Sequence, residues 1–335
     1  MKMKKFINNP ENLTQELLEG MALAYADKIK LAEGKVVERA VPKSQDKVAV
    51  ITLGGAGHEP ALSGFVGEGM LDASVVGDIF AAPNAISLFN ALKKFKRDAG
   101  ILLVVLNHAG DVMSSNMALK MAEREGIKVK SILVSDDISA GLDAPAKDRR
   151  GLAGCIPLIK VAGAAAEEGK SLDEVYAVAE KFGSRIATLA VAMTGCTHPQ
   201  NATPISELAD DEMEIGMGQH GEGGGGRSKI LTADETAKIM FSNLSKAVDL
   251  KAGEEIFVIV NGTGATTPME LAIVFRAVAA LAGEAGAKVA GGIIDEILTV
   301  QEMAGFQLIV CVVDGESKRY LKARSNAPYW TSLGE

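Results

Sequence analysis

The sequence predicts an α/β protein of two α/β domains, each with a central sheet covered by helices, and an active site between loops at the carboxyl ends of strands. Three observations predict this class. The chain has 335 residues, more than one average domain contains. Its hydrophobic content is 47% but its aromatic content only 4%, so the core is built from aliphatic side chains. Short apolar runs alternate with segments of helical periodicity, an order typical of αβ units.

The domain boundary is predicted at residues 193 and 194. The stretch Thr194–Pro204 contains Gly195, two prolines and several small polar residues, which suit a linker or an ordered connection. We therefore expect an N-terminal α/β domain over residues 1–193 and a C-terminal α/β domain over residues 194–335.

The first predicted element is a helix over Glu11–Ala32, where leucines recur at helical spacing. Lys47–Leu53 (KVAVITL) is a buried strand, which we expect to end at the glycine run Gly54–Pro60. Ile101–Leu106 (ILLVVL) is continuously apolar, as expected for a parallel strand covered on both faces. The other predicted elements are strands over Ala73–Val76 and Val129–Val134, a helix over Ala85–Phe95, a helix ending near Glu125, an irregular region around Arg149, and helices over Leu158–Glu168 and Leu172–Met193.

The second half of the chain predicts a similar alternation. Asp211–Met217 alternates polar and apolar residues like a half-buried strand. Thr232 and Glu235 have the spacing of a capping box, which predicts a helix from there to about Val248. The remaining predictions are strands over Ile256–Val260, Val289–Ile294 and Leu308–Val313, and a helix from Pro268.

Composition and charge exclude several classes of function. The net charge is -8 and no basic stripe carries aromatic residues, so we expect no nucleic-acid partner. The three cysteines, at positions 155, 196 and 311, lie far apart without metal-ligand spacing, so we expect free thiols and no metal site. No apolar run reaches the ~20 residues that span a bilayer, and none follows the basic Met1–Phe6, so we expect a cytoplasmic protein without membrane attachment.

Three loops that follow predicted strands contain unusual residues, and in open α/β sheets ligands bind beyond the carboxyl ends of strands. The loops are Gly54–Pro60, Asn107–Asp111 and Gly218–Gly226. Three of the four histidines of the chain lie in them, namely His58, His108 and His220. Such clustering favours a functional role for these loops.

His220 lies in the glycine-rich sequence GQHGEGGGG, which begins at Gly218. Glycine has no Cβ, so backbone and ligand can approach closely, and a histidine among glycines is expected to be accessible. An unprotonated imidazole nitrogen is a nucleophile. The alternative interpretation is a surface histidine on a flexible loop. Glu222 would either orient His220 or be solvated.

The loops of His58 and Asp111 are also open to two interpretations. Backbone amides of Gly54–Pro60 could bind an anion or a sugar hydroxyl, although the run is neither a Walker A loop nor G-x-G-x-x-G. The alternative for His58 is a turn histidine bonded to backbone. Asp111 precedes a helix, so it is either an N-cap residue or a general base that takes a proton from a substrate hydroxyl.

Five segments spread over most of the chain closely resemble the K subunit of dihydroxyacetone kinases. They are Gly54–Pro60 (GGAGHEP), Gly64–Met70 (GFVGEGM), Asn107–Asp111 (NHAGD), Asp148–Gly154 (DRRGLAG) and Glu212–Gly223 (EMEIGMGQHGEG). The last segment is long and specific. The sequence is therefore identified as a member of this family.

The resemblance implies that three side chains are catalytic. His220 would add through Nε2 to the carbonyl carbon of a small ketose and form a covalent hemiaminal, which glycerol cannot form. Asp111 would lie near the hydroxyl to be phosphorylated, and His58 would contact the ketose and assist proton transfer. The backbone of Gly55, Ala56 and Gly57 would bind substrate hydroxyls.

The resemblance also implies partners. The chain has no convincing site for a nucleotide or Mg²⁺ of its own, so it is expected to bind no cofactor. A separate L subunit would carry ATP or ADP with Mg²⁺, and a phosphocarrier M subunit of the phosphotransferase system would recharge that nucleotide, or ATP would exchange. The K subunit is expected to be a homodimer.

The sequence departs from the family pattern at two positions. Many relatives have lysine where Leu106 stands and serine where Ala56 stands, so a ketose such as erythrulose or apulose could replace dihydroxyacetone as the substrate. Two other functions stay open. One is a paralogue that binds dihydroxyacetone without catalysis and acts as a transcription co-activator, and the other is a sugar- or nucleotide-binding protein without covalent chemistry.

Overall fold

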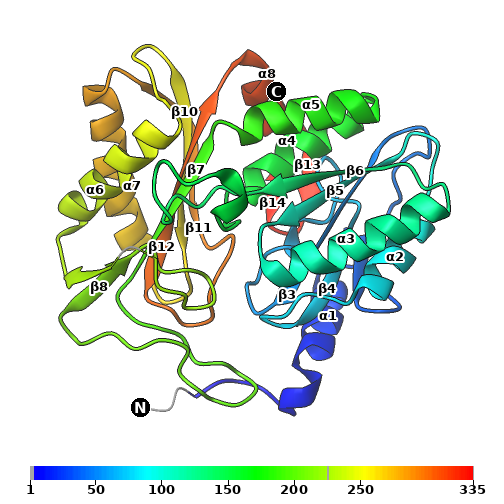
Figure 1. The fold of residues 1–335 in the computed structure, drawn as a ribbon, viewed down its shortest axis with the longest axis horizontal. Helices are drawn as coiled ribbons and strands as arrows, with labels where there is room; N and C mark the ends of the chain where they lie inside the picture. The colour runs from blue at the N-terminus through cyan, green and yellow to red at the C-terminus, as the bar shows by residue number, and fades with distance from the viewer. Residues whose placement is uncertain (1–3, 225, 335) are drawn as a thin grey trace. The chain divides into compact units, whose positions relative to one another are not determined.

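The computed structural model describes residues 4–224 and 226–334, so Met1–Met3 and Gly225 of the predicted loop lie outside the described residues (Figure 1). The chain divides into two compact units. We call residues 6–134, 155–181 and 319–334 the N-terminal unit, and residues 4–5, 135–154 and 182–318 the C-terminal unit. Each unit contains a six-stranded sheet with helices packed on it, which confirms the predicted α/β class.

The units are not the two halves of the chain that the sequence predicts. Strand β7 (Ile186–Ala192) precedes the predicted boundary, yet it pairs along its whole length with β12 (Gly305–Val313) near the end of the chain. At the boundary, the backbone N–H groups of Met193 and Thr194 both donate to Ala304 O, so this connection continues along the same sheet. Strand pairing therefore assigns both sides of residue 193 to the C-terminal unit.

The sheet of the N-terminal unit has the strand order β1-β2-β4-β3-β5-β6. Its strands are β1 (Ile29–Ala32), β2 (Val36–Arg39), β3 (Ala49–Ala56), β4 (Ala73–Ile79), β5 (Ile101–Leu106) and β6 (Val129–Val134). The last four are parallel to one another, and β1 and β2 add an antiparallel hairpin at one edge. All six residues of β5 are buried, as its unbroken apolar sequence predicts.

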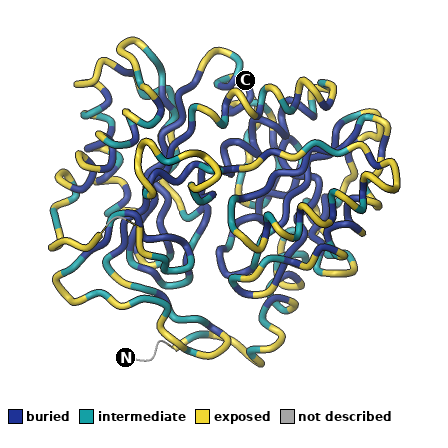
Figure 2. The backbone as a smooth tube through the Cα atoms, viewed as in Figure 1, coloured by how far each residue is buried: buried dark blue, intermediate teal, exposed yellow. Residues whose placement is uncertain are grey.

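Helices cover this sheet. The helices of the N-terminal unit are α1 (Leu13–Ala24), α2 (Ala85–Lys94), α3 (Ala109–Arg124), α4 (Cys155–Glu167) and α5 (Leu172–Gly183), and a small hairpin of β13 (Ser325–Ala327) and β14 (Trp330–Ser332) follows near the end of the chain. Helices α2 and α3 pack together and share a core cluster with the sheet. Helix α4 contacts β3 and β5 and is buried along nearly its whole length (Figure 2).

Two predictions for the N-terminal unit differ from the structure. The helix predicted over Glu11–Ala32 ends at Ala24, because Ile29–Ala32 pairs with β2 through a turn in which Gly34 and Lys35 have positive φ. The strand predicted to end before the glycine run continues through Ala56, because its last residues still pair with β4. Glycine therefore did not end the strand.

The sheet of the C-terminal unit has the order β11-β10-β12-β7-β8-β9. Besides β7 and β12, its strands are β8 (Glu212–Ile215), β9 (Arg227–Lys229), β10 (Glu255–Gly262) and β11 (Lys288–Asp295). Only β10 and β11 are parallel among these neighbours. Helices α6 (Ala233–Ala247) and α7 (Pro268–Glu284) pack on one face in a common core, and α8 (Gly315–Lys322) follows β12.

The helix predicted over Leu172–Met193 is two elements in the structure. Helix α5 ends at Gly183, and β7 follows with all seven residues buried. Its run of small and β-branched residues is compatible with a helix by local pattern, but pairing with β12 selects the strand.

The cysteines at positions 155, 196 and 311 are buried free thiols, as the sequence predicts. Burial raises the pKa of the Cys196 thiol to about 11. Among the helices in the described part of the chain, none combines the length and apolar character that crossing a bilayer requires.

Candidate functional site

His220 lies in the turn that follows β8 in the C-terminal unit. Its Nδ1 is 3.2 Å from Glu222 Oε1, and its backbone N–H donates to Glu222 Oε2 at 2.9 Å. The turn is closed by Gly218 N–H, which donates to Glu222 O at 2.7 Å, and by Gly221 N–H, which donates to Gly218 O at 3.1 Å. The His220 side chain is 28% exposed. The loop is therefore a hydrogen-bonded turn that holds the histidine in one orientation and still leaves it accessible.

Arg150 ties this turn to the rest of the C-terminal unit. Its Nη2 donates to Gly216 O at 2.7 Å and its Nη1 to Glu222 O at 3.3 Å, on either side of His220. Asp137 in turn accepts from Arg150 Nε at 2.7 Å. A guanidinium can bond to these three acceptors at once because it is planar and presents several N–H donors in a rigid arrangement. Arg150 lies in the DRRGLAG segment, but no local pattern distinguishes it from the neighbouring Arg149.

A side chain at position 218 would displace two groups that hold the turn together. A Cβ built there would overlap the Glu222 carboxylate and the Arg150 guanidinium. Gly221 has a φ of +74°, which L side chains rarely adopt. Gly218 therefore leaves room for the Glu222 and Arg150 side chains, and Gly221 allows the backbone conformation of the turn, whether or not a ligand also approaches them.

The electrostatics of the turn define the tautomer of His220. Burial opposes ionisation of Glu222, but hydrogen bonds from the ring and backbone N–H of His220 outweigh it and lower the pKa of Glu222 to about 2. Glu222 is thus a carboxylate at neutral pH, and it accepts the Nδ1 proton. In the neutral ring the lone pair then resides on Nε2, because the carboxylate fixes the proton on Nδ1.

His58 lies at the carboxyl edge of the sheet in the N-terminal unit, directly after β3. It is 6% exposed, and its ring packs against Phe80 with the centroids 4.9 Å apart at an angle of 42°. Gly57 has a φ of +104°, and a Cβ there would lie 2.8 Å from the Phe80 ring. The turn that carries His58 is thus shaped by the segment after β4.

Asp111 lies at the same edge, because β5 is the parallel neighbour of β3. It is 8% exposed and belongs to the first turn of α3. The N-cap of α3 is His108, so Asp111 is not the N-cap residue that the sequence left as an alternative.

Glu59 is a further buried carboxyl at this edge, and it was not among the predicted site residues. Its Oε1 accepts from Gly57 N–H at 2.9 Å, and burial raises its pKa. A cavity of about 10 Å³ lies beneath the run from Gly54 to Ala56, enough for roughly one water molecule. This cavity cannot hold a ketose. The only sequence signal for Glu59 is its position between His58 and Pro60.

The predicted site residues are divided between the two units. The edge of the N-terminal unit holds Gly55, Ala56, Gly57, His58 and Asp111, whereas His220 belongs to the C-terminal unit. The two positions that depart from the family pattern, Leu106 and Ala56, are both buried at the ends of β5 and β3. Their apolar side chains suit these surroundings.

These features define a class of protein with two α/β units. One unit has a histidine that a carboxylate orients in a glycine-rich turn. The other has a histidine and an aspartate at the carboxyl edge of its parallel strands. Within this class, the chain belongs to the family of the Dak1 domain, which matches residues 19–329.

Relatives in this family are kinases and a co-activator. The chain is 39% identical to the PTS-dependent dihydroxyacetone kinase 1 dihydroxyacetone-binding subunit DhaK of Listeria innocua, over 94% of this chain and 95% of that one. It is 36% identical to an L-erythrulose kinase of Pectobacterium atrosepticum, over 97% of this chain and 56% of that protein. Its fold matches the dihydroxyacetone kinase operon co-activator Dha-DhaQ with a TM-score of 0.89 at 33% identity, over 95% of this chain and 98% of that one.

Proposed function

We propose that the chain is the substrate-binding subunit of a ketose kinase, which holds a small ketose as a covalent hemiaminal on His220. The observation that carries the proposal is the 3.2 Å pair of His220 Nδ1 and Glu222 Oε1, because it leaves the nucleophilic lone pair on Nε2. The identity of the family member from Listeria innocua as a dihydroxyacetone-binding subunit supports the choice of ligand class.

The covalent step balances as follows. The Nε2 lone pair forms a bond to the carbonyl carbon, the C=O π bond breaks, and the oxygen takes a proton from solvent to become a hydroxyl. The ring retains its Nδ1 proton and becomes a cation, which the Glu222 carboxylate neutralises. Only a carbonyl compound can react in this way, so glycerol is excluded despite its similar hydroxyl groups.

The residues of the N-terminal unit are assigned to the phosphoryl transfer. Asp111 takes the proton of a ketose hydroxyl as its oxygen attacks the γ-phosphoryl group, and a nucleoside diphosphate leaves. His58 contacts the ketose and assists proton transfer, and the backbone of Gly55, Ala56 and Gly57 binds hydroxyls. The nucleotide and Mg²⁺ are supplied by an L subunit, recharged by ATP exchange or by a phosphocarrier M subunit.

The experiment that tests the covalent step is intact-mass spectrometry of the full chain after incubation with dihydroxyacetone and desalting. We expect the mass to increase by one ketose in the parent protein and not in His220→Ala. Glycerol is the control ligand and should add nothing. An adduct of the same mass on the His220→Ala variant would refute the assignment.

A second candidate function is a ketose sensor that acts on transcription, favoured by the structural match to the operon co-activator. The presence of both Asp111 and His58 favours the kinase. An assay with an L subunit, ATP and Mg²⁺ distinguishes the two. Phosphorylation of a ketose supports the kinase, and a bound adduct with no phosphate transfer to any ketose supports the sensor.

The ketose itself is tested in the same assay. The resemblance implies polar side chains where this chain has Leu106 and Ala56, and one relative is an L-erythrulose kinase, so erythrulose is compared with dihydroxyacetone. We also infer that the subunit is a homodimer. Light scattering should then give twice the mass of the chain.

A further inference from the structure

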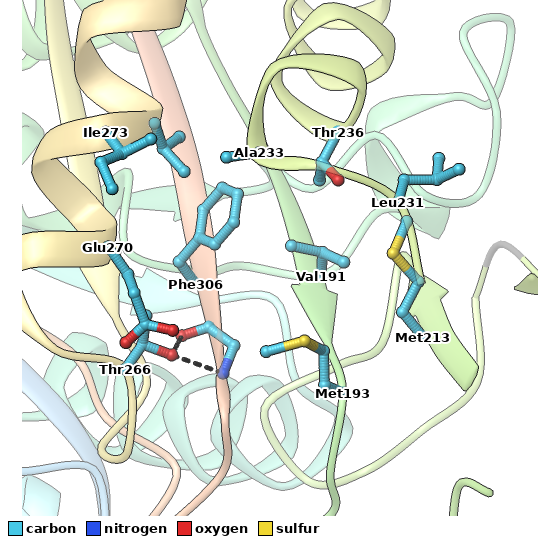
Figure 3. A pocket seen from close by; sticks show the side chains of 12 residues that line it. Val191, Met193, Met213, Leu231, Ala233, Thr236, Thr266, Glu270, Ile273 and Phe306 are labelled. Carbon is cyan, nitrogen blue, oxygen red and sulfur yellow. Dashed lines mark hydrogen bonds between the residues drawn. The ribbon is translucent and has the colours of Figure 1, made fainter. Parts of the chain in front are cut away.

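A pocket unrelated to the residues above lies within the C-terminal unit, between helices α6 and α7 and the strands β7, β8 and β12 (Figure 3). Its volume is about 190 Å³. Buried apolar side chains form its floor, including Val191, Met213 and Phe306, and Ile273 lies at 42% exposure on its α7 side. Met213 belongs to β8, the strand that leads into the His220 turn.

The size of the pocket limits what it can hold. An apolar protein cavity of about 150 Å³ is large enough to bind benzene, so this pocket has room for a single ring or a chain of about six carbons. Side chains that face empty space lose their dispersion contacts on that side, so filling the pocket with apolar atoms is favourable. Its lining therefore selects a small apolar group.

Most polar side-chain atoms that line the pocket already form hydrogen bonds within the protein. Thr236 Oγ1 donates to Thr232 O at 2.9 Å. Thr266 Oγ1 donates to Gly305 O at 2.7 Å, as Figure 3 shows. Glu270 differs, because its Oε2 accepts from the backbone N–H and hydroxyl of Thr267 while no hydrogen bond from the described residues reaches its Oε1. These two bonds also lower the pKa of Glu270, so the carboxylate is ionised at neutral pH.

We propose that this pocket binds a small molecule with an apolar body of about six carbons and a cationic or hydrogen-bond-donating head, which donates to Glu270 Oε1. An alkylammonium ion has this chemistry. An alkyl carboxylate of the same length is repelled by Glu270 and binds more weakly.

The experiment measures binding of n-butylamine, n-hexylamine, 1-hexanol and hexanoate to the full-length protein by ligand-observed NMR. We expect affinity for the amines to rise about fourfold per added methylene, because each buried CH₂ contributes a constant increment. Hexylammonium should bind about tenfold more tightly than hexanoate. Equal affinity for all four ligands would overturn the proposal.

Two variants locate the binding site. Ala233→Leu fills the pocket and should abolish hexylamine binding, whereas Ala272→Leu, on the exposed side of α7, should leave it unchanged. Retention of the ketose adduct verifies that each variant is folded. Hexylamine binding that persists in the Ala233→Leu variant would overturn the proposal.

The chain offers a matched control for the charge. Glu270 and Glu235 are the N3 residues of two capping boxes with the same contacts, and of the two only Glu270 lines the pocket. Glu270→Gln should remove the preference for hexylammonium over hexanoate, and Glu235→Gln should preserve it. If both variants behave alike, the proposed role of Glu270 is wrong. Loss of binding as protein concentration rises would place a second copy of the chain on the pocket and also overturn the proposal.

Discussion

At the scale of single residues, the chemistry of His220 depends on its neighbour two positions along the chain. Glu222 contacts both the ring and the backbone N–H of His220, and Arg150 holds the turn that joins them. A histidine among glycines would otherwise sample many orientations and both neutral tautomers. The turn therefore holds the His220 ring in one orientation and favours the tautomer with its lone pair on Nε2.

This arrangement predicts the effect of Glu222→Ala. Removal of a charged hydrogen-bond partner costs roughly 1.5–3 kcal/mol, so the equilibrium constant for adduct formation should fall at least about tenfold. Titration with dihydroxyacetone followed by intact-mass analysis measures this. Glu207→Ala, at an exposed position in the same unit, is the control and should match the parent protein. Unchanged adduct formation in the Glu222→Ala variant would show that the carboxylate does not orient the ring.

Asp111→Asn separates binding from turnover. The amide keeps the size of the side chain but cannot accept the hydroxyl proton, so the adduct on His220 should form normally while phosphoryl transfer falls by about 10²–10⁴-fold. Product formation with an L subunit, ATP and Mg²⁺ gives the rate, and intact mass gives the adduct. Normal turnover by this variant would remove Asp111 from the role of general base.

At the scale of elements, a buried carboxylate connects residues 135–154 to β7 by a hydrogen bond. Asp136 accepts from the backbone N–H groups of Leu152 and Gly154 at 2.7 and 2.9 Å, and from the hydroxyl of Thr188 on β7. Burial raises the pKa of Asp136 to about 6 despite these donors. An ionisable group near the start of the segment that carries Arg150 thus connects this segment to its own far end and to β7.

The raised pKa of Asp136 predicts a pH dependence of stability with a definite sign. The Asp136 carboxyl retains its proton more strongly in the folded state than in the unfolded state. Its protonation therefore adds to the free energy of unfolding. This added stability is fully present below the unfolded pKa of 3.8 and is lost as pH rises through about 6. The free energy of unfolding of the parent protein relative to Asp136→Asn should therefore fall, by on the order of 3 kcal/mol, from about pH 4 to about pH 7.

Urea denaturation of both proteins across this range measures the difference. Asp210→Asn, at an exposed position, is the control and should show no such slope relative to the parent. A constant difference between the parent and Asp136→Asn would mean that the carboxyl titrates alike in the folded and unfolded states.

Several elements were predictable because their local patterns are unambiguous. Strands β5 and β6 occupy the predicted residues, and the Thr232–Glu235 spacing located the start of α6. Over β7 the local pattern does not distinguish a helix from a strand, because small and β-branched residues occur in both. Pairing with β12, more than 100 residues away, decided it.

At the scale of the whole molecule, the net charge of -8 bears on the sensor alternative. Phosphate backbones attract positive charge, so an acidic chain without a basic stripe should not bind DNA. Fluorescence anisotropy with labelled duplex DNA at about 0.1 M salt should show no binding, with or without dihydroxyacetone. Salt-dependent DNA binding would contradict this and would favour direct action on a promoter over contact with a regulator protein.

The sequence by itself determined the α/β class, the family and the three loops, because periodicity, composition and motifs are properties of neighbouring residues. Only the tertiary structure decided how the chain divides into units, that Arg150 holds the His220 turn, and that His108 rather than Asp111 occupies the N-cap position of α3. The physical reason is that strand pairing and side-chain contacts join segments far apart in sequence, and local patterns do not specify which partners meet.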